Sequence, residues 1–146
     1  MAPKLALPTI RMQDYQNGVT LLAGLAQTDT SGGRAAAQVV LSAYNGSDWQ
    51  LDVTDLCLLD PKHYQAALNV IRGRVELAVE PHRLIPDGDR VFGRIWDRWK
   101  RYHLENRWKQ TCPSCWGRKV HTEYDDENRE TQTPCRRCNG TGLITD

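Results

Sequence analysis

The first part of the chain carries apolar residues at helical spacing. Tyr15, Val19, Leu22 and Ala26 recur at positions i, i+4, i+7 and i+11, which places them on one face of a helix that starts near Thr9. The polar segment TDTSGGR follows. It predicts the end of this helix, because its glycines give the backbone freedom and Ser, Thr and Asp are capping residues.

A second helix is expected through RAAAQVVLSAY, and it should end at the turn sequence NGSD. The segment WQLDVTDLCLLD alternates only loosely between apolar and polar residues. We expect a short extended or irregular piece that packs on the helices. Within it, Cys57 is expected to be a small buried core residue.

A third helix begins with strong signals. Asp60 is a capping residue, and Pro61 occupies the first helical position, where its missing N–H has no cost. This helix should end before Pro81. The expected core-facing stripe consists of Tyr64, Leu68, Ile71, Val75 and Ala78.

A fourth helix is expected from roughly Asp89 to Lys109, after a turn at Pro86-Asp87-Gly88. Its apolar side is formed by Phe92, Ile95, Trp96, Trp99 and Tyr102. Because the cysteine-rich segment follows directly, this helix is expected to act as a rigid strut. The sequence therefore predicts a mainly α protein, a small bundle of about four helices with a C-terminal zinc-stabilised β-hairpin module. The expected division is a flexible tail (1–8), the bundle (9–109) and a zinc-binding four-cysteine module (110–146).

Four cysteines supply the clearest chemical signal. Cys112, Cys115, Cys135 and Cys138 follow the pattern C-x2-C-x19-C-x2-C, which is within the range of zinc sites. A redox device would need one reactive pair in a thioredoxin-like βαβ setting, and disulfides are rare in a reducing cytosol. We therefore predict one zinc ion held by these four residues. With all four positions filled by protein, the site is expected to be structural.

The surroundings of the cysteines fit this interpretation. Gly117 and Gly140 each stand two residues after the second cysteine of a pair, where a positive φ lets backbone N–H groups face the sulfurs. Between the pairs, KVHTEY and ETQT have strand character and DDEN is a turn, so a hairpin should return the second pair to the first. The metal would then hold a short basic hairpin.

The sequences CPSCWGR and CRRCNGTG resemble the CxxCxGxG repeat of the DnaJ-type cysteine-rich zinc domain, over about thirty residues. The second copy matches through Gly142, whereas the first lacks the final glycine. Similar Cys-x-x-Cys turns, which we call knuckles, occur in some phage antitermination proteins. The resemblance implies a zinc module without co-chaperone function, because no His-Pro-Asp motif is present. The first hundred residues, at LLAGLAQTDTSGGRAAAQVVLSAYNG and DVTDL, also resemble uncharacterised proteins of plasmids and phages.

Charge is unevenly distributed, although the net charge of the 146 residues is only +1. Basic residues dominate from Arg94 to Lys119, where only Asp97 and Glu105 are acidic. Such asymmetry suggests an anionic partner, and a solvated helix face is the alternative. The candidate partner-binding residues are Arg94, Arg98, Arg101, Arg107, Lys109, Arg118, Lys119, Arg136 and Arg137.

Tryptophans offer a further possible contact. Trp96, Trp99 and Trp108 are expected mainly in packing, and Trp108 and Trp116 are the best placed for base stacking. No His, Ser or carboxylate has a recognisable catalytic spacing, so we expect no enzyme. No apolar run is long enough to span a membrane and no signal peptide is evident, so a cytoplasmic protein is expected.

Two functions therefore remain open. The first is a non-enzymatic zinc-binding protein of a mobile element that binds nucleic acid or a nucleoprotein complex. The second is a protein–protein inhibitor of a host defence complex, for example an anti-CRISPR.

Overall fold

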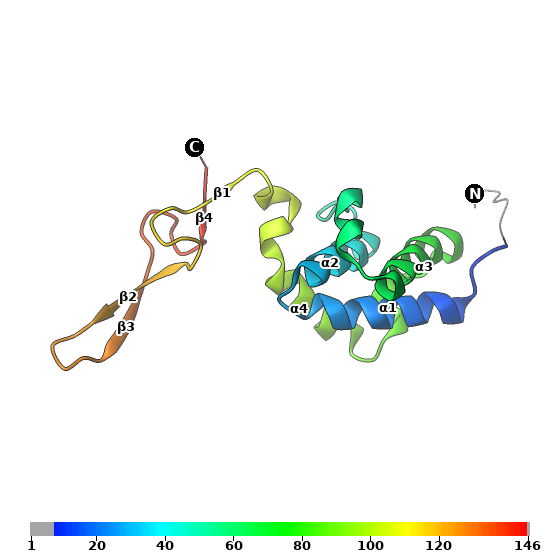
Figure 1. The fold of residues 1–146 in the computed structure, drawn as a ribbon, viewed down its shortest axis with the longest axis horizontal. Helices are drawn as coiled ribbons and strands as arrows, with labels where there is room; N and C mark the ends of the chain where they lie inside the picture. The colour runs from blue at the N-terminus through cyan, green and yellow to red at the C-terminus, as the bar shows by residue number, and fades with distance from the viewer. Residues whose placement is uncertain (1–7, 146) are drawn as a thin grey trace. The chain divides into compact units, whose positions relative to one another are not determined.

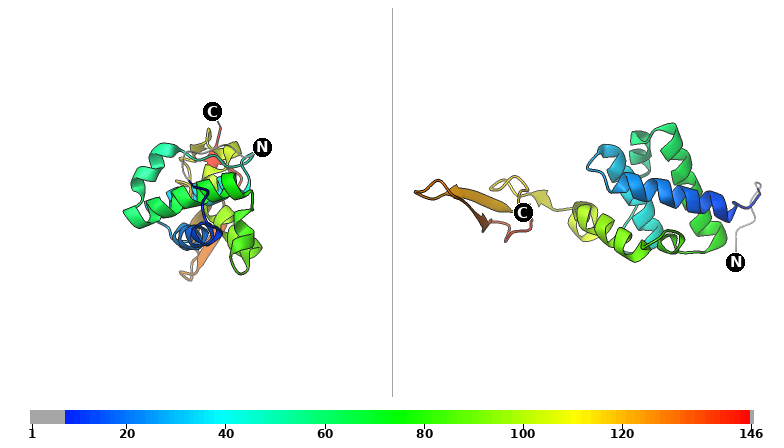
Figure 2. Two further views of the ribbon diagram at one scale, coloured as in Figure 1. Left: turned by 90° about the vertical axis from the view of Figure 1, so that its right-hand side faces the viewer. Right: turned by 90° about the horizontal axis from the view of Figure 1, so that it is seen from below.

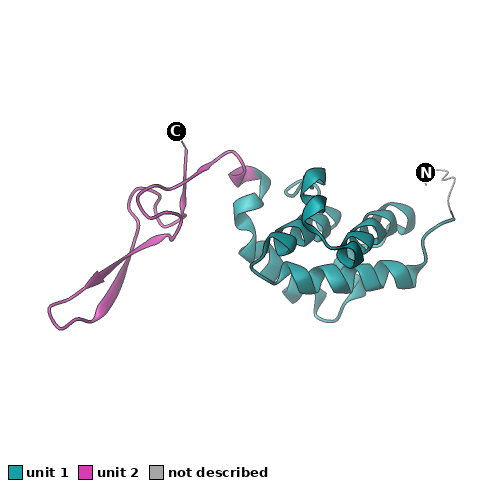
Figure 3. Ribbon diagram, in the orientation of Figure 1, with its two compact units in different colours: residues 1–104 teal, residues 105–146 magenta. Residues whose placement is uncertain are grey.

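The computed structural model describes residues 8–145 of the protein. The chain divides into two compact units, unit 1 (Met1–Leu104) and unit 2 (Glu105–Asp146), which Figure 3 shows in separate colours. Residues 1–7, most of the predicted tail, lie outside the described residues.

Unit 1 is a bundle of four α-helices. They are α1 (Met12–Ala26), α2 (Ser31–Tyr44), α3 (Pro61–Leu77) and α4 (Gly88–Arg98). Short 3₁₀ turns, η1 (Val53–Leu58) and η2 (Pro81–Leu84), lie in the connections, and α1 packs along α3 and α2 (Figures 1 and 2). The predicted mainly α fold class is confirmed. The segment expected to be extended or irregular contains η1.

Capping residues fix the starts of two helices. The Asp60 side chain accepts a hydrogen bond from the backbone N–H of His63 at 2.9 Å, and Pro61 is the first residue of α3, as predicted. The Thr30 hydroxyl accepts one from the N–H of Gly33 at 2.9 Å. These bonds satisfy N–H groups that have no partner within the helix.

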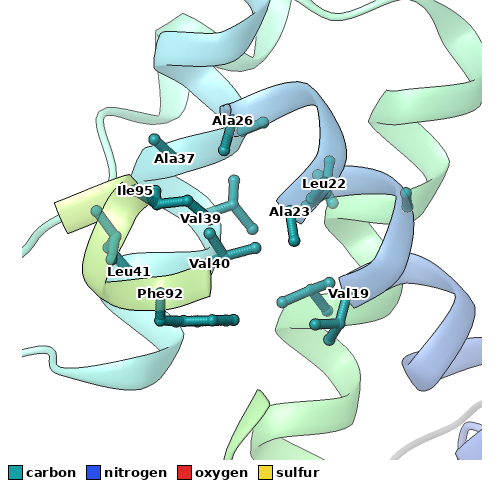
Figure 4. Close-up of a cluster of buried hydrophobic side chains, with 14 of the residues drawn as sticks. Val19, Leu22, Ala23, Ala26, Ala37, Val39, Val40, Leu41, Phe92 and Ile95 are labelled. Carbon is teal, nitrogen blue, oxygen red and sulfur yellow. The ribbon is translucent and has the colours of Figure 1, made fainter. Parts of the chain in front are cut away.

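The core of unit 1 is built from α1, α2 and α4 together with small residues of α3. The stripe predicted on α1 is confirmed, because Tyr15, Val19, Leu22 and Ala26 are all fully buried. Figure 4 shows part of this cluster, in which α1 faces Val39 and neighbouring residues of α2 and the side chains of Phe92 and Ile95 from α4.

Two glycines permit the close approach of α1 and α3. A Cβ added to Gly73 of α3 would overlap the ring of Tyr15, and one added to Gly18 of α1 would stand 2.9 Å from the carbonyl oxygen of Ala66. The Tyr15 hydroxyl donates to the carbonyl of Val79, and burial raises the pKa of this phenol to about 12. The contact of the Tyr15 ring with the backbone at Gly73 is therefore central to the packing of α1 on α3.

The core-facing stripe predicted on α3 is wrong. Tyr64, Ile71 and Val75 are 44%, 37% and 57% exposed, and they lie on the side of the helix away from the core. The buried face of α3 consists of Ala66, Ala67, Val70 and Gly73. Small residues line the core side because α1 approaches so closely, and the larger apolar residues are left facing outward.

The fourth helix is also shorter than predicted. It ends at Arg98, and the chain continues through 3₁₀ turns η3 (Lys100–Tyr102) and η4 (Leu104–Asn106). The indole Nε1 of Trp99 donates to the carbonyl of Ala26 at 2.7 Å, and the N–H of Leu104 donates to the carbonyl of Asp48 at 2.9 Å. These tertiary bonds draw the chain onto unit 1, so a continuous strut to Lys109 does not form.

Unit 2 contains two small antiparallel strand pairs. Strand β1 (Gln110–Thr111) pairs with β4 (Leu143–Ile144), and β2 (Val120–Tyr124) pairs with β3 (Glu130–Pro134). The β2–β3 hairpin, which is visible in Figure 1, matches the predicted strands and turn. The pair β1–β4 joins the two ends of the unit.

Candidate metal centre

The four predicted ligands lie together in unit 2. Cys112 and Cys115 stand between β1 and β2, and Cys135 and Cys138 stand between β3 and β4. All four are buried and form the hydrophobic cluster of this unit, against which only Ile144 packs among the described residues. Two sequence-distant knuckles therefore meet because the hairpin folds back between them.

The sulfur positions have the geometry of a tetrahedral metal site. The Sγ atoms of Cys112 and Cys135 are 3.9 Å apart, those of Cys115 and Cys138 are 3.7 Å apart, and all four lie within 4.8 Å of one another. Zinc–sulfur bonds of about 2.3 Å in a tetrahedron require sulfurs about 3.8 Å apart. A disulfide needs about 2.05 Å, and all four cysteines are free. The cluster is one structural zinc site.

The two knuckles have the same backbone course. Gly117 and Gly140 have φ of +78° and +76°, so the predicted positive φ is confirmed at both. After each turn a backbone N–H returns to the second cysteine, from Arg118 to the carbonyl of Cys115 at 3.0 Å and from Thr141 to the carbonyl of Cys138 at 3.1 Å. The left-handed glycines make the tight turns that direct both thiols inward.

Backbone N–H groups also act on the sulfurs, as predicted. The N–H of Gly142 donates to the Sγ of Cys138 at 3.2 Å. The N–H groups of Cys138 and Arg137 lower the pKa of Cys135 to about 5 against the opposing effect of burial, and His121 adds to this shift. Because zinc binds the thiolate form, these donors prepare the site for the metal.

The site is closed and cross-braced. The N–H of Cys112 donates to the carbonyl of Gly142, and the N–H of Cys135 donates to the carbonyl of Lys119, both at 2.9 Å. Each knuckle is thereby bonded to the other. Four protein ligands leave no open position on zinc, so the metal here organises the fold and does not catalyse.

The candidate partner-binding residues fall into two groups. Arg94 and Arg98 are exposed on α4, and within residues 8–145 neither pairs with a carboxylate. Arg101 lies beyond the helix in η3, so the arginine-lined face is shorter than the sequence suggested. The other group belongs to unit 2: Arg107, Lys109, Arg118, Lys119, Arg136 and Arg137.

The expectation of a basic hairpin is wrong. The four basic residues next to the cysteines are exposed, but they lie on the knuckles outside strands β2 and β3. The hairpin itself is acidic, and its Arg129 is paired with Asp125 and Glu127 at 3.0 and 2.9 Å. Its carboxylates are Glu123, Asp125, Asp126, Glu127 and Glu130. The net positive charge of the C-terminal half therefore conceals basic segments at the cysteines and an acidic hairpin between them.

The structure also places Cys57 and three of the tryptophans. Cys57 is exposed, not buried as predicted, because η1 turns it to solvent. Trp108 and Trp116 are 68% and 76% exposed, whereas Trp99 belongs to the core of unit 1. In the described part of the chain, no helix has the length and apolar character needed to cross a membrane.

The family model described as "Family of unknown function (DUF7673)" matches residues 17–100, which is more than half of the chain. The protein belongs to this family. The matched residues lie within unit 1, so the four cysteines of unit 2 are outside the DUF7673 region. No curated protein and no solved structure matches the chain significantly.

Proposed function

We propose that this protein binds nucleic acid or a nucleoprotein complex through the exposed basic residues of unit 2 and of α4, and that it acts by binding without catalysis. The zinc ion holds the knuckles in place and takes no part in chemistry. The likeness of the knuckles to DnaJ-type and phage antitermination zinc modules, and of the first hundred residues to plasmid and phage proteins, supports a role in a mobile element.

The separation of charge within unit 2 carries this proposal. Four exposed basic side chains, Arg118, Lys119, Arg136 and Arg137, lie on the segments next to the cysteines, whereas the hairpin carries five carboxylates and one cation, Arg129. Random placement on a solvated surface would mix the two signs. A unit with one basic end and one acidic end is oriented by a polyanion, which attracts the zinc end and repels the hairpin tip.

The exposed apolar stripe of α3 favours a second function. Tyr64, Ile71 and Val75 face outward at the spacing of a helix–helix contact, and such stripes commonly mark protein interfaces. This observation supports a protein partner, as expected for an inhibitor of a host defence complex such as an anti-CRISPR. In that case α3, and not the zinc end of unit 2, would carry the affinity.

Binding to labelled DNA and RNA, measured by fluorescence anisotropy at several salt concentrations, tests the first function. The zinc-loaded protein should bind at low salt and weaken as salt rises, because each neutralised phosphate contributes about 0.9 to the log–log slope for duplex DNA. Arg136→Glu with Arg137→Glu should reduce the affinity at least tenfold.

The matched control is Lys62→Glu with Arg83→Glu. Both side chains are exposed on unit 1, and the pair changes the net charge equally. It should leave binding nearly unchanged. Equal losses of affinity in both double variants would show that only the net charge matters. If the protein binds no nucleic acid at low salt, the first function is excluded. Capture of a protein partner by wild type but not by Ile71→Asp would then support the second.

A further inference from the structure

Trp116 has an unfavourable backbone and an unfavourable environment at once. Its φ is +55°, in the left-handed region that bulky residues rarely adopt, and its side chain is 76% exposed. Neither burial nor backbone preference explains a tryptophan here. Strained residues that gain nothing from packing are commonly held for function.

The second knuckle shows what the zinc site itself requires. Asn139 follows Cys138 directly, as Trp116 follows Cys115, and the φ values of the two residues agree at +53° and +55°. Gly142 is the fourth residue after Cys138, as Lys119 is after Cys115, and their φ values are +80° and +75°. Asparagine and glycine tolerate the left-handed conformation, whereas tryptophan and lysine are disfavoured there. The same turn can therefore be built without the ring and without the ammonium group.

Both disfavoured residues are of kinds that contact nucleic acid. Trp116 offers a flat aromatic face, Lys119 a positive charge, and Arg118 between them a second cation, and all three are exposed. Aromatic faces stack on bases of any sequence, and cations next to them hold the phosphates. The turn thus presents a stacking surface and charges in one short loop.

A pocket of about 340 Å³ adds to this end of unit 2. Lys109, Arg137, Cys138 and Asn139 line it together with strand β4 and Thr145. The Lys109 ammonium lies 3.0 Å from the Oδ1 of Asn106 and 5.9 Å from the ring centre of Trp108, which is also exposed. A second exposed tryptophan therefore lies near a cation, as Trp116 stands near Arg118 and Lys119 in the sequence.

We infer that the zinc end of unit 2 takes single-stranded nucleic acid, with an unpaired base stacked on Trp116 and phosphates held by Lys119 and the pocket of Lys109 and Arg137. This inference rests on the proposed function and specifies its ligand. In a duplex the flat faces of the bases are covered by their neighbours. A protruding indole finds an open face only on an unpaired base.

The test exchanges residues between the knuckles. Trp116→Asn and Lys119→Gly install the residues of the second knuckle, so zinc content should be kept and the melting temperature of unit 2 should be equal or higher. Binding to labelled oligothymidine and oligouridine is measured by anisotropy, with a duplex of the same length beside them. Because the chain has five tryptophans, the part of the emission quenching that is lost in Trp116→Asn reports stacking on that ring.

Wild type should prefer the single strands to the duplex, and the strands should quench its emission. Trp116→Asn should lose roughly tenfold in single-strand affinity, the usual effect of one stacked base, with duplex binding unchanged. Trp116→Phe should retain most of the single-strand affinity, because it keeps an aromatic face. Lys119→Gly should lower the salt slope by about 0.7, the value for one phosphate of a single strand.

Equal affinity of wild type for duplex and single strands would overturn the inference, as would unchanged single-strand binding by Trp116→Asn. The proposed function would survive either result. If wild type binds no nucleic acid at low salt, the proposed function fails, and this inference fails with it.

Discussion

Each of the two units of this protein is stabilised internally by a different force. Unit 1 has a core of large apolar side chains, with Tyr15, Leu22, Trp49 and Phe92 among those fully buried. The buried cluster of unit 2 consists of four cysteines, and among its described residues the other apolar side chains are exposed or only half-buried. One unit is stabilised by the removal of apolar surface from water, and the other by ligand–metal bonds.

Because of this difference, the surfaces of the two units depend on different supports. A unit with a closed apolar core tolerates change on its surface, because its stability comes from within. Unit 2 has nearly all its side chains outside, and zinc replaces the core that the chain does not supply. Exposed residues such as Trp116 are therefore available for contact, provided that the metal is in place.

Removal of zinc should have the largest effect, and it should affect one unit only. Cys135→Ser, or a strong chelator, should unfold unit 2 and leave unit 1 folded, because metal binding contributes about 10–16 kcal/mol in small zinc peptides. Elemental analysis and the amide NMR spectrum measure this outcome, with one zinc per chain in wild type. Cys57→Ser is the control and should retain the metal. A Cys135→Ser variant with an unchanged unit 2 spectrum would contradict the structural role of zinc.

The complementary change affects only unit 1. Gly73→Ala places a Cβ in the ring of Tyr15, and overpacking of this kind destabilises by about 1–3 kcal/mol. Denaturant unfolding followed by far-UV circular dichroism gives the free energy, and zinc content should not change. Gly93→Ala on α4 is the matched control, since nothing lies within 4 Å of its added methyl group.

Gly93→Ala should stabilise unit 1 by up to about 1 kcal/mol, because alanine is the better helix former. A Gly73→Ala protein as stable as wild type would show that the α1–α3 contact can relax. Loss of zinc from either variant would show that the units do not depend on separate forces.

The smallest expected effect concerns the share of α4 in binding. Arg94→Glu with Arg98→Glu should weaken nucleic-acid affinity by a few-fold at low salt, less than the exchange at Arg136 and Arg137, and the effect should vanish at high salt. Anisotropy titrations at two salt concentrations measure it, and an unchanged helical signal confirms the fold. A loss of affinity larger than that caused by the Arg136 and Arg137 exchange would show that α4 makes the main contact.

Local patterns predicted several elements correctly. The α1 stripe, the Asp60-Pro61 start of α3, the β2–β3 hairpin and the glycine turns each depend on residues close together in the chain. Their physical causes are equally local: helical period, capping hydrogen bonds, and backbone freedom at Gly117 and Gly140.

The errors share the opposite cause. The outward-facing apolar residues of α3 are spaced like a core stripe, and only the approach of Tyr15 to Gly73 makes the small-residue face the buried one. The end of α4 at Arg98 depends on bonds from Trp99 to Ala26 and from Leu104 to Asp48. These partners are distant in sequence, so no periodicity in the segment reveals them.

The sequence by itself determined the metal site, because two Cys-x-x-Cys pairs with glycine turns bring their own geometry and need only a hairpin between them. It also determined the helical class, through the periodic apolar residues. Only the tertiary structure decided which face of α3 is buried and where α4 ends. Spacing fixes contacts within one turn or hairpin, whereas burial depends on which distant segments the fold brings together.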